Sequence, residues 1–279
     1  MRGKTIVVTG ATSGIGEVAA IRLAQQGARI VFTARDPKRA SATMAKLTKA
    51  NGSLEHVVHM ADLSLLAEQK RVARDIAAEP KIDVLINNAG AMFNRRSETP
   101  DGLERTFALN HMGYFTVTNL LLERLKQTPD ARIVTVSSNA HRRAHLDFDD
   151  LQSRRAYQGF AVYSKSKLCN ILFNRALAKR LAGTGVTANV LHPGFVATRF
   201  GDNSGGLMRT VLKVAKPIGA ISPEEGAQTM VYLASSPAVE NVSGVYFYEC
   251  KSALPTAEAR NDEDARRLWE MSAQIAGLD

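Results

Sequence analysis

Short apolar segments alternate along the chain with longer segments in which apolar residues recur every three to four positions. The short segments are typical of buried strands, and the longer ones of helices that cover them. The predicted strands are residues 5–8, 28–33, 54–60, 83–86, 132–137, 187–191 and 244–247. The predicted helices are 17–26, 37–50, 64–78, a long one within 100–126, and 160–182. This alternation predicts an α/β fold with a doubly wound parallel sheet and helices on both faces.

Composition agrees with one large globular unit. The chain has 279 residues, of which 45% are hydrophobic and 23% charged, and it shows no repeat or flexible linker. We therefore expect a single domain over 1–279. Cys169 and Cys250 provide neither a disulfide framework nor a metal-ligand cluster. No apolar run is long enough to span a bilayer, and the first strand begins at Thr5, so we expect a cytoplasmic protein without a signal peptide or a membrane anchor.

The net charge is +9. Three arginine pairs lie in predicted loops, at 95–96, 142–143 and 154–155. Such pairs favour a phosphorylated cofactor, an anionic membrane surface or nucleic acid. No long basic run or interleaved aromatic track accompanies them, so we interpret them as solvated faces and expect no nucleic-acid partner.

A glycine-rich turn, residues 9–16, joins the first strand to the first helix. This arrangement places a pyrophosphate against free N–H groups at a helix N-terminus. Gly10 suits a tight turn, Gly14 leaves room for a ligand, and Gly16 lets the helix pack closely. The alternative is a glycine turn without a ligand. The predicted cofactor contacts in this turn are Gly10, Thr12, Ser13, Gly14, Ile15 and Gly16.

The end of the second strand indicates which dinucleotide binds. Ala34 stands where a ribose-binding carboxylate is expected, and Arg35 follows it. A guanidinium there pairs with a 2′-phosphate, so we expect NADP(H) rather than NAD. Asp36 is either a ribose ligand or the cap of the helix that begins at Pro37. Arg39 is either a second phosphate contact or an exposed helix residue.

Two further strand ends carry candidate cofactor contacts. Asp62 and Leu63 follow the third strand and are placed to flank an adenine, although Asp62 suits a helix cap equally well. Asn88, Ala89 and Gly90 follow the fourth strand, where a turn is the alternative interpretation.

Tyr163 and Lys167 carry the strongest chemical argument. They stand four residues apart on a predicted helix and therefore share one face. A nearby ammonium favours the phenolate, so we expect Lys167 to lower the pKa of Tyr163 and make it a proton donor or acceptor near neutral pH. Ser138, at the end of the fifth strand, is placed to hold a substrate oxygen.

Taken in order, these motifs resemble the short-chain dehydrogenase/reductase family over about residues 4 to 250. The matching positions are 9–16, 87–90, Asn110, Ser138, Tyr163-xxx-Lys167 and 192–194. The resemblance implies a single Rossmann-type domain, a nicotinamide cofactor and a catalytic tetrad of Asn110, Ser138, Tyr163 and Lys167. In it, Tyr163 and Lys167 also contact the cofactor, and Asn110 holds a water that links Lys167 to solvent.

One departure points to a branch of the family. Ser138 and Tyr163 are 25 positions apart, farther than is usual, and this long connector resembles the retinol dehydrogenase-like branch, as does the tail over 265–270. Members of that branch often carry an N-terminal membrane anchor, which this chain is expected to lack. The expected substrate is thus a lipophilic alcohol or carbonyl that need not be a retinoid.

The segment after the sixth strand completes the expected site. Pro193, Gly194, Val196 and Thr198 are expected to face the nicotinamide and diphosphate, whereas His192 is expected to be structural. Residues 195–221 carry apolar positions that predict either a substrate lid or a plain surface helix.

The expected function is an NADP-dependent alcohol dehydrogenase or carbonyl reductase, as a homodimer or tetramer. The alternatives are a nucleotide-sugar epimerase or dehydratase and a non-catalytic NADP sensor.

Overall fold

A computed structural model describes residues 1–196 and 221–278 of the chain. Its centre is an eight-stranded sheet in the order β3-β2-β1-β4-β5-β6-β7-β8, in which the first seven strands are parallel and β8 pairs antiparallel with β7. The strands are β1 (Thr5–Val8), β2 (Arg29–Ala34), β3 (Val57–Met60), β4 (Val84–Asn87), β5 (Arg132–Val136), β6 (Thr187–Leu191), β7 (Tyr246–Tyr248) and β8 (Lys251–Ser252).

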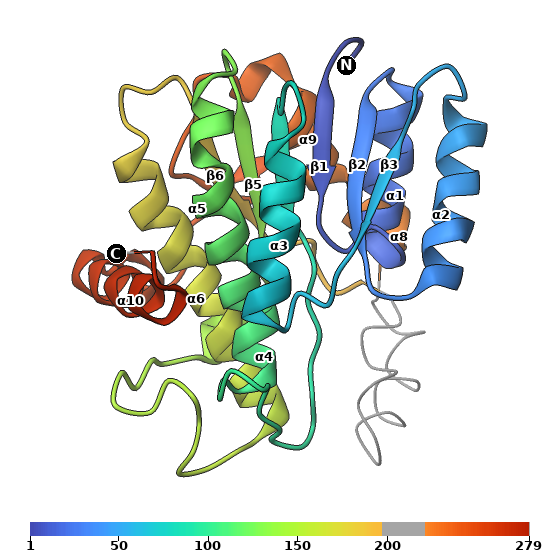
Figure 1. Cartoon of the computed structure of the whole chain (residues 1–279). Helices are drawn as coiled ribbons and strands as arrows, with labels where there is room; N and C mark the ends of the chain where they lie inside the picture. Colours follow the sequence, from blue (N-terminus) through green and yellow to red (C-terminus); the bar gives the residue numbers. More distant parts are fainter. Residues whose placement is uncertain (197–220, 279) are drawn as a thin grey trace.

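Helices cover both faces of the sheet (Figure 1). One face packs against α3 (Leu66–Ala77), α5 (Gly113–Lys126) and α6 (Gly159–Arg180), with α10 (Asp262–Ala276) lying against α6. The other packs against α1 (Gly14–Gln25), α2 (Pro37–Ala50) and α9 (Gln228–Ser235). The short helices are α4 (Arg105–Phe107), α8 (Pro223–Gly226), the π-helix η1 (Ala108–Met112) and the 3₁₀ turns η2 (Asn139–Arg143), η4 (Pro237–Val239) and η5 (Glu258–Arg260).

This architecture confirms the predicted α/β fold, including all seven predicted strands to within a few residues. The long helix predicted within 100–126 is confirmed, because helical residues run without a break from Arg105 to Lys126 as α4, η1 and α5. Glu104 caps its start by accepting hydrogen bonds from the N–H groups of Thr106 and Phe107, and η1 adds a π-helical turn that the sequence did not predict. Sequence reasoning also missed α8, α9 and α10, and the two-residue edge strand β8.

The strand order places a crevice at the carboxyl ends of β1 and β4. From β1 the chain proceeds to β2 and β3 on one side, and then crosses back to β4 on the other. Ligands of open parallel sheets bind where the order reverses in this way.

In the part of the chain that the structure describes, no helix combines the length and apolar character needed to cross a bilayer.

Candidate active site

A cavity of about 1070 Å³ opens at the carboxyl ends of the parallel strands. Nearly all of the catalytic and cofactor-binding residues that the sequence predicted line this cavity. The predicted residues that line it are Gly10, Thr12, Ser13, Gly14, Ile15, Arg35, Arg39, Asp62, Leu63, Asn88, Ala89, Gly90, Ser138, Tyr163, Lys167, Pro193, Gly194 and Val196. Gly16 and Asn110 lie behind its wall. Thr198, and most of the predicted lid over 195–221, fall outside the described residues.

The glycine turn is held against the loop after β4. Gly10 has φ +69°, and a Cβ there would lie 2.7 Å from the Cα of Ala89, so only glycine fits. The amide of Asn88 donates to the carbonyls of Thr9 and Gly10 at 3.1 and 2.9 Å. Asn88 therefore shapes the cavity wall by tying two loops together. A Cβ on Gly16 would lie 2.6 Å from the carbonyl oxygen of Gly10, which agrees with the predicted packing role.

The N-terminus of α1 faces this cavity with the features of an anion site. Helix α1 begins at Gly14, and the Ser13 side chain makes no capping hydrogen bond to it. N–H groups at such a helix start are the usual partners of a diphosphate. The residues present thus fit the diphosphate of a dinucleotide.

At the tip of β2 the structure separates the two interpretations of Asp36. Its carboxylate accepts a hydrogen bond from the N–H of Arg39 at 3.0 Å and caps α2, which holds the pKa of Asp36 below its usual value. Arg35 is 57% exposed at the cavity rim, and its guanidinium lies 3.8 Å from Asp62. An ion pair this long and this exposed is weak, so Arg35 remains available to bind a more highly charged anion such as a phosphate.

Asp62 has a structural role as well. Its Oδ1 accepts hydrogen bonds from the N–H and the hydroxyl of Ser64 at 3.0 and 2.7 Å. Partial burial acts to raise the pKa of Asp62, but these hydrogen bonds and the nearby Arg35 hold it below its usual value. Asp62 therefore stays ionised and shapes the turn after β3 beside the cavity.

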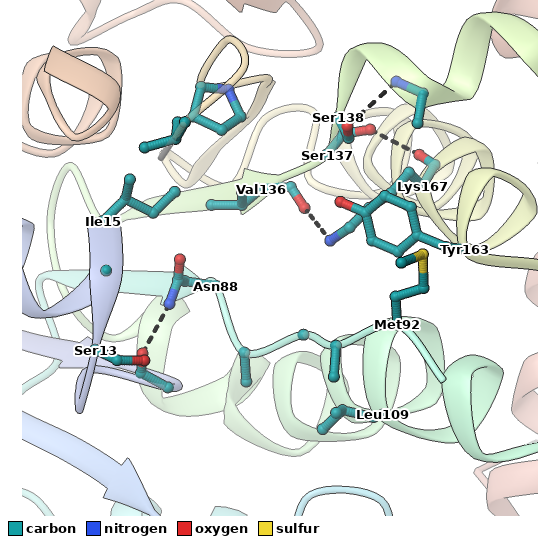
Figure 2. Close-up of a pocket in the computed structure, with 18 of the residues that line it drawn as sticks. Ser13, Ile15, Asn88, Met92, Leu109, Val136, Ser137, Ser138, Tyr163 and Lys167 are labelled. Carbon is teal, nitrogen blue, oxygen red and sulfur yellow. Dashed lines mark hydrogen bonds between the residues drawn. The ribbon is translucent and has the colours of Figure 1, made fainter. Parts of the chain in front are cut away.

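Tyr163 and Lys167 extend from α6 into the cavity side by side (Figure 2). Both side chains are nearly inaccessible to solvent, at 8% and 3% exposure. The Lys167 ammonium donates to the carbonyl of Val136 at 3.1 Å and lies 5.7 Å from the centroid of the Tyr163 ring. The four-residue spacing therefore brings the two groups to one face, as predicted.

The expected lowering of the Tyr163 pKa by Lys167 is wrong for the protein alone. Burial raises the pKa of Tyr163 to about 12, although a hydrogen bond with Ser138 acts to lower it. Burial lowers the pKa of Lys167 to about 7. Burial disfavours the charged form of each group, so both pKa values shift toward the neutral form.

The two serines after β5 have different roles. Ser137 is buried, and its hydroxyl donates to the carbonyl of Lys167 at 2.7 Å, which fixes α6 on the sheet. Ser138 lines the cavity and accepts a hydrogen bond from the N–H of Ala140 at 3.2 Å. The Ser138 side chain is also hydrogen-bonded with Tyr163.

Asn110 lies in the π-turn of η1 and is completely buried. Its Oδ1 accepts from the N–H of Ala91, and its amide donates to the carbonyl of Ala91 and to Ser166, at 2.9, 2.9 and 3.0 Å. The side chain therefore positions the loop after β4 against α6. The water-holding role of Asn110 stays a prediction.

His192 has the structural role that was expected for it, and His141 and Cys169 are buried. His192 stacks on Tyr248 with ring centroids 4.1 Å apart and accepts from the N–H of Gly194, and burial lowers its pKa to about 4. His141 is buried and bonds to the carbonyl of Ser138 at 2.7 Å. Cys169 is packed in the core.

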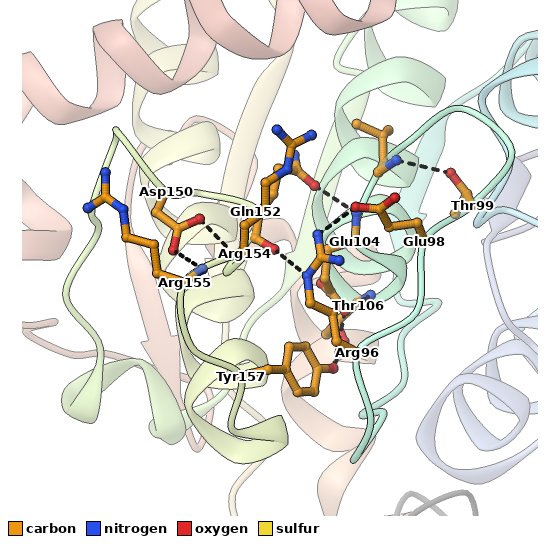
Figure 3. Close-up of polar contacts among 11 residues, drawn as sticks. Arg96, Glu98, Thr99, Glu104, Thr106, Asp150, Gln152, Arg154, Arg155 and Tyr157 are labelled. Carbon is orange, nitrogen blue, oxygen red and sulfur yellow. Dashed lines mark hydrogen bonds and ion pairs between the residues drawn. The ribbon is translucent and has the colours of Figure 1, made fainter.

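Sequence reasoning missed a polar cluster that fixes the substrate side of the cavity (Figure 3). The hydroxyl of Tyr157, at the end of the long connector, donates to the carbonyl of Phe93 at 2.8 Å and lies 3.2 Å from the buried carboxylate of Glu104. Gln152 accepts from the N–H of Glu104 at 2.7 Å. Because Phe93 lines the cavity, the connector supports its wall. The only sequence signal was the unusual length of the connector.

Comparisons with known proteins agree with this geometry. A family model described as short chain dehydrogenase matches residues 4–205. Human retinol dehydrogenase 14 is 41% identical over 298 positions, covering 100% of this chain and 88% of that protein. Human retinol dehydrogenase 13 is 41% identical over 284 positions, covering 99% and 86%.

Solved structures share the fold. An uncharacterized protein from Mycobacterium paratuberculosis has a TM-score of 0.79 and 31% identity, with 99% of this chain and 94% of that chain covered. The Pseudomonas aeruginosa RhlG/NADP complex has a TM-score of 0.70 and 27% identity, with 88% and 94% covered.

Proposed function

The chain belongs to the short-chain dehydrogenase family, as its retinol dehydrogenase-like relatives show, and we propose on this basis that it is an NADP-dependent oxidoreductase interconverting a hydrophobic alcohol and its aldehyde or ketone. The observation that carries the proposal is the shared cavity. It holds an uncapped helix start for a diphosphate, an arginine at the tip of β2, and a phenol beside a lysine.

NADP(H) is favoured over NAD(H) by the charge at the tip of β2. Arg35 and Arg39 line this end of the cavity, and the carboxylate of Asp36 is occupied as a helix cap. A guanidinium pairs strongly with the 2′-phosphate, whereas a ribose diol calls for a free carboxylate. The structurally similar RhlG forms an active-site complex with NADP, which supports this proposal.

The protein residues supply the proton transfer. Bound NADPH supplies the hydride in the reductive direction. Tyr163 donates its proton to the carbonyl oxygen of the substrate, and the hydroxyl of Ser138 donates a hydrogen bond to that oxygen. Lys167, whose pKa burial lowers to about 7, can take up or release a proton beside Tyr163 near neutral pH.

The walls of the cavity favour an apolar substrate. Met92, Phe93, Phe160 and Phe195 are among the residues that line it. Phe160 and Phe195 are 36% and 50% exposed, so a bound apolar chain would remove their rings from water. Retinal belongs to this class of substrates, as do other long aldehydes and ketones.

The test is a turnover screen of the purified protein. Retinal, long-chain aldehydes and hydrophobic ketones are offered with NADPH or NADH, and the binding of each cofactor is measured separately. We expect tighter binding of NADPH and oxidation of NADPH with at least one of these substrates. Tight NADPH binding without turnover of any substrate would identify a sensor and contradict the proposal.

A further inference from the structure

The part of the cavity beyond Ser138 carries a second pair of arginines. The 3₁₀ turn η2 follows Ser138 directly and brings Arg142 and Arg143 to the cavity wall. Sequence reasoning interpreted this pair as a solvated face. The structure places both residues on the lining of the cavity that holds Tyr163.

The two guanidinium groups are arranged differently. Arg142 is oriented by two hydrogen bonds, from Nε to Asn139 at 2.9 Å and from Nη2 to the carbonyl of Leu254 at 3.0 Å. Arg143 is exposed, and its side chain forms no hydrogen bond or ion pair with any residue in 1–196 or 221–278. Neither arginine forms an ion pair with a carboxylate in these ranges.

The carboxylates that line the cavity lie at its other end. They are Asp36, which caps α2, and Asp62, which is bonded to Ser64 and pairs with Arg35. Glu249 lies near His192 but is not part of the lining, and it is hydrogen-bonded to Tyr248. The lining beyond Ser138 is thus cationic without a compensating acid among the described residues.

Arg142 and Arg143 lie apart from the arginines at the tip of β2. Strands β1 and β4 lie between β2 and β5, and three strand spacings amount to about 14 Å. A 2′-phosphate bound by Arg35 therefore leaves Arg142 and Arg143 unpaired. Phe93, Phe160 and Phe195 add apolar surface to the lining of the same cavity.

Building on the proposed function, we infer that the natural substrate is an amphipathic carbonyl compound or alcohol that carries an anionic group. The reacting carbon lies at Tyr163 and Ser138, the apolar body lies against the phenylalanines, and a carboxylate or phosphate is bound by Arg142 and Arg143. A guanidinium pairs with either anion through charge-assisted hydrogen bonds, which are stronger than neutral ones.

The test compares matched substrates. A medium-chain aldehyde with a terminal carboxylate is compared with its methyl ester and with the corresponding terminal phosphate monoester, each with NADPH. One charge-assisted contact corresponds to a preference of about 10- to 100-fold in kcat/KM over the neutral ester. The anionic substrate with the higher kcat/KM, carboxylate or phosphate, identifies the group that the site binds.

Two variants assign the preference to the arginines. Arg143→Gln, at a side chain without a hydrogen bond or ion pair to the described residues, is expected to reduce the preference for the anion about 10-fold or more. Arg154→Gln removes an exposed arginine of the same connector outside the cavity and is expected to leave that preference unchanged. An equal preference in wild type and Arg143→Gln contradicts the inference, and so does a loss of NADPH affinity in Arg143→Gln, because the arginine would then serve the cofactor.

A binding measurement keeps this inference separate from the proposed function. Calorimetry with NADPH present compares a saturated long-chain carboxylate with the corresponding alcohol, neither of which has an aldehyde or ketone group to reduce. We expect tighter binding of the carboxylate, weakened by Arg143→Gln and by added salt. Equal affinities overturn the inference. Turnover of none of the aldehydes overturns the proposed function, whichever ligand binds more tightly.

Discussion

The side-chain amide of Asn110 donates a hydrogen bond to the hydroxyl of Ser166 over 3.0 Å. Ser166 in turn donates to the main-chain carbonyl of Tyr163 at 2.7 Å. Because Asn110 also binds both main-chain polar groups of Ala91, one buried amide joins the loop after β4 to the helix that carries the phenol. The position of Tyr163 thus depends on a residue that does not itself line the cavity.

Replacing Ser166 with alanine tests this connection. The change leaves one N–H of the Asn110 amide without its buried partner, at a cost of about 1–3 kcal/mol in the free energy of unfolding. We expect kcat to fall several-fold, with little change in NADPH affinity, because Tyr163 is less well positioned. Urea unfolding and steady-state kinetics measure the two effects.

Ser164→Ala is the matched control for that variant. Ser164 is another buried serine of α6, but its hydroxyl bonds only to the carbonyl of Phe160 within the helix. Equal losses of kcat in the two variants would show that the link to Asn110 has no positioning role.

The pKa of Tyr163 predicts that alcohol oxidation and carbonyl reduction depend differently on pH. Burial raises this pKa to about 12, so the phenol keeps its proton at neutral pH and is ready to donate it. Alcohol oxidation needs the deprotonated form, so kcat/KM for oxidation should rise between pH 7 and 10, whereas that for reduction should not.

Ser138→Ala should increase the difference between the pH profiles of oxidation and reduction. Its hydrogen bond acts to lower the pKa of Tyr163, so removing it moves the rise of the oxidation profile to higher pH. The profile is measured in both directions with one alcohol and aldehyde pair. An oxidation profile that does not change in the variant would contradict the role of Ser138.

Lys167 predicts how stability depends on pH. Burial lowers its pKa from the ordinary 10.5 to about 7. Between these values the unfolded chain holds a proton that the folded protein lacks, so this residue makes the free energy of unfolding rise with pH. Below pH 7 both states are protonated, and the folded protein carries the full cost of the buried ammonium.

Lys167→Met removes this contribution. The variant should exceed wild type in stability at pH 6, by on the order of a few kcal/mol, and the difference should shrink by pH 9. Urea unfolding of both proteins at pH 6 and 9 provides the comparison. A difference that is constant across this range would mean that Lys167 titrates normally.

Arg35 sets the preference for the phosphorylated cofactor. Arg35→Ala should weaken NADPH binding by about 10- to 100-fold, the value of a charge-assisted contact, and leave NADH binding nearly unchanged. Lys38→Ala, a change at an exposed residue of α2 outside the cavity lining, serves as the control. Equal losses for both cofactors in Arg35→Ala would place the arginine elsewhere in the site.

The sequence predicted those parts of the fold and site that depend on local pattern. The strand at 5–8 is a short apolar run after Thr5, and the helix at 37–50 begins with a proline, so their bounds agree with the structure. The strand β8 consists of two residues, both exposed, and is too short to show a hydrophobic pattern in the sequence. Single-domain organisation, a homodimer or tetramer and a cytoplasmic location stay predictions.

What the sequence could not provide depends on distant neighbours. Glu104 and Tyr157 are 53 residues apart, and nothing local indicates that they meet. The raised pKa of Tyr163 follows from burial by residues of several elements, whereas the sequence shows only the lysine one turn away. Arg142 and Arg143 likewise look like a solvated pair until η2 places them on the cavity wall.

The central claim is that Tyr163 transfers the proton. Single-turnover oxidation of bound NADPH by a hydrophobic aldehyde, in wild type and in Tyr163→Phe, tests it most directly. The variant should bind NADPH as wild type does, because the phenylalanine keeps the packing, while the hydride-transfer rate falls by about 10²–10⁴, the usual contribution of a general acid. A rate close to that of wild type, with NADPH bound, would contradict the account.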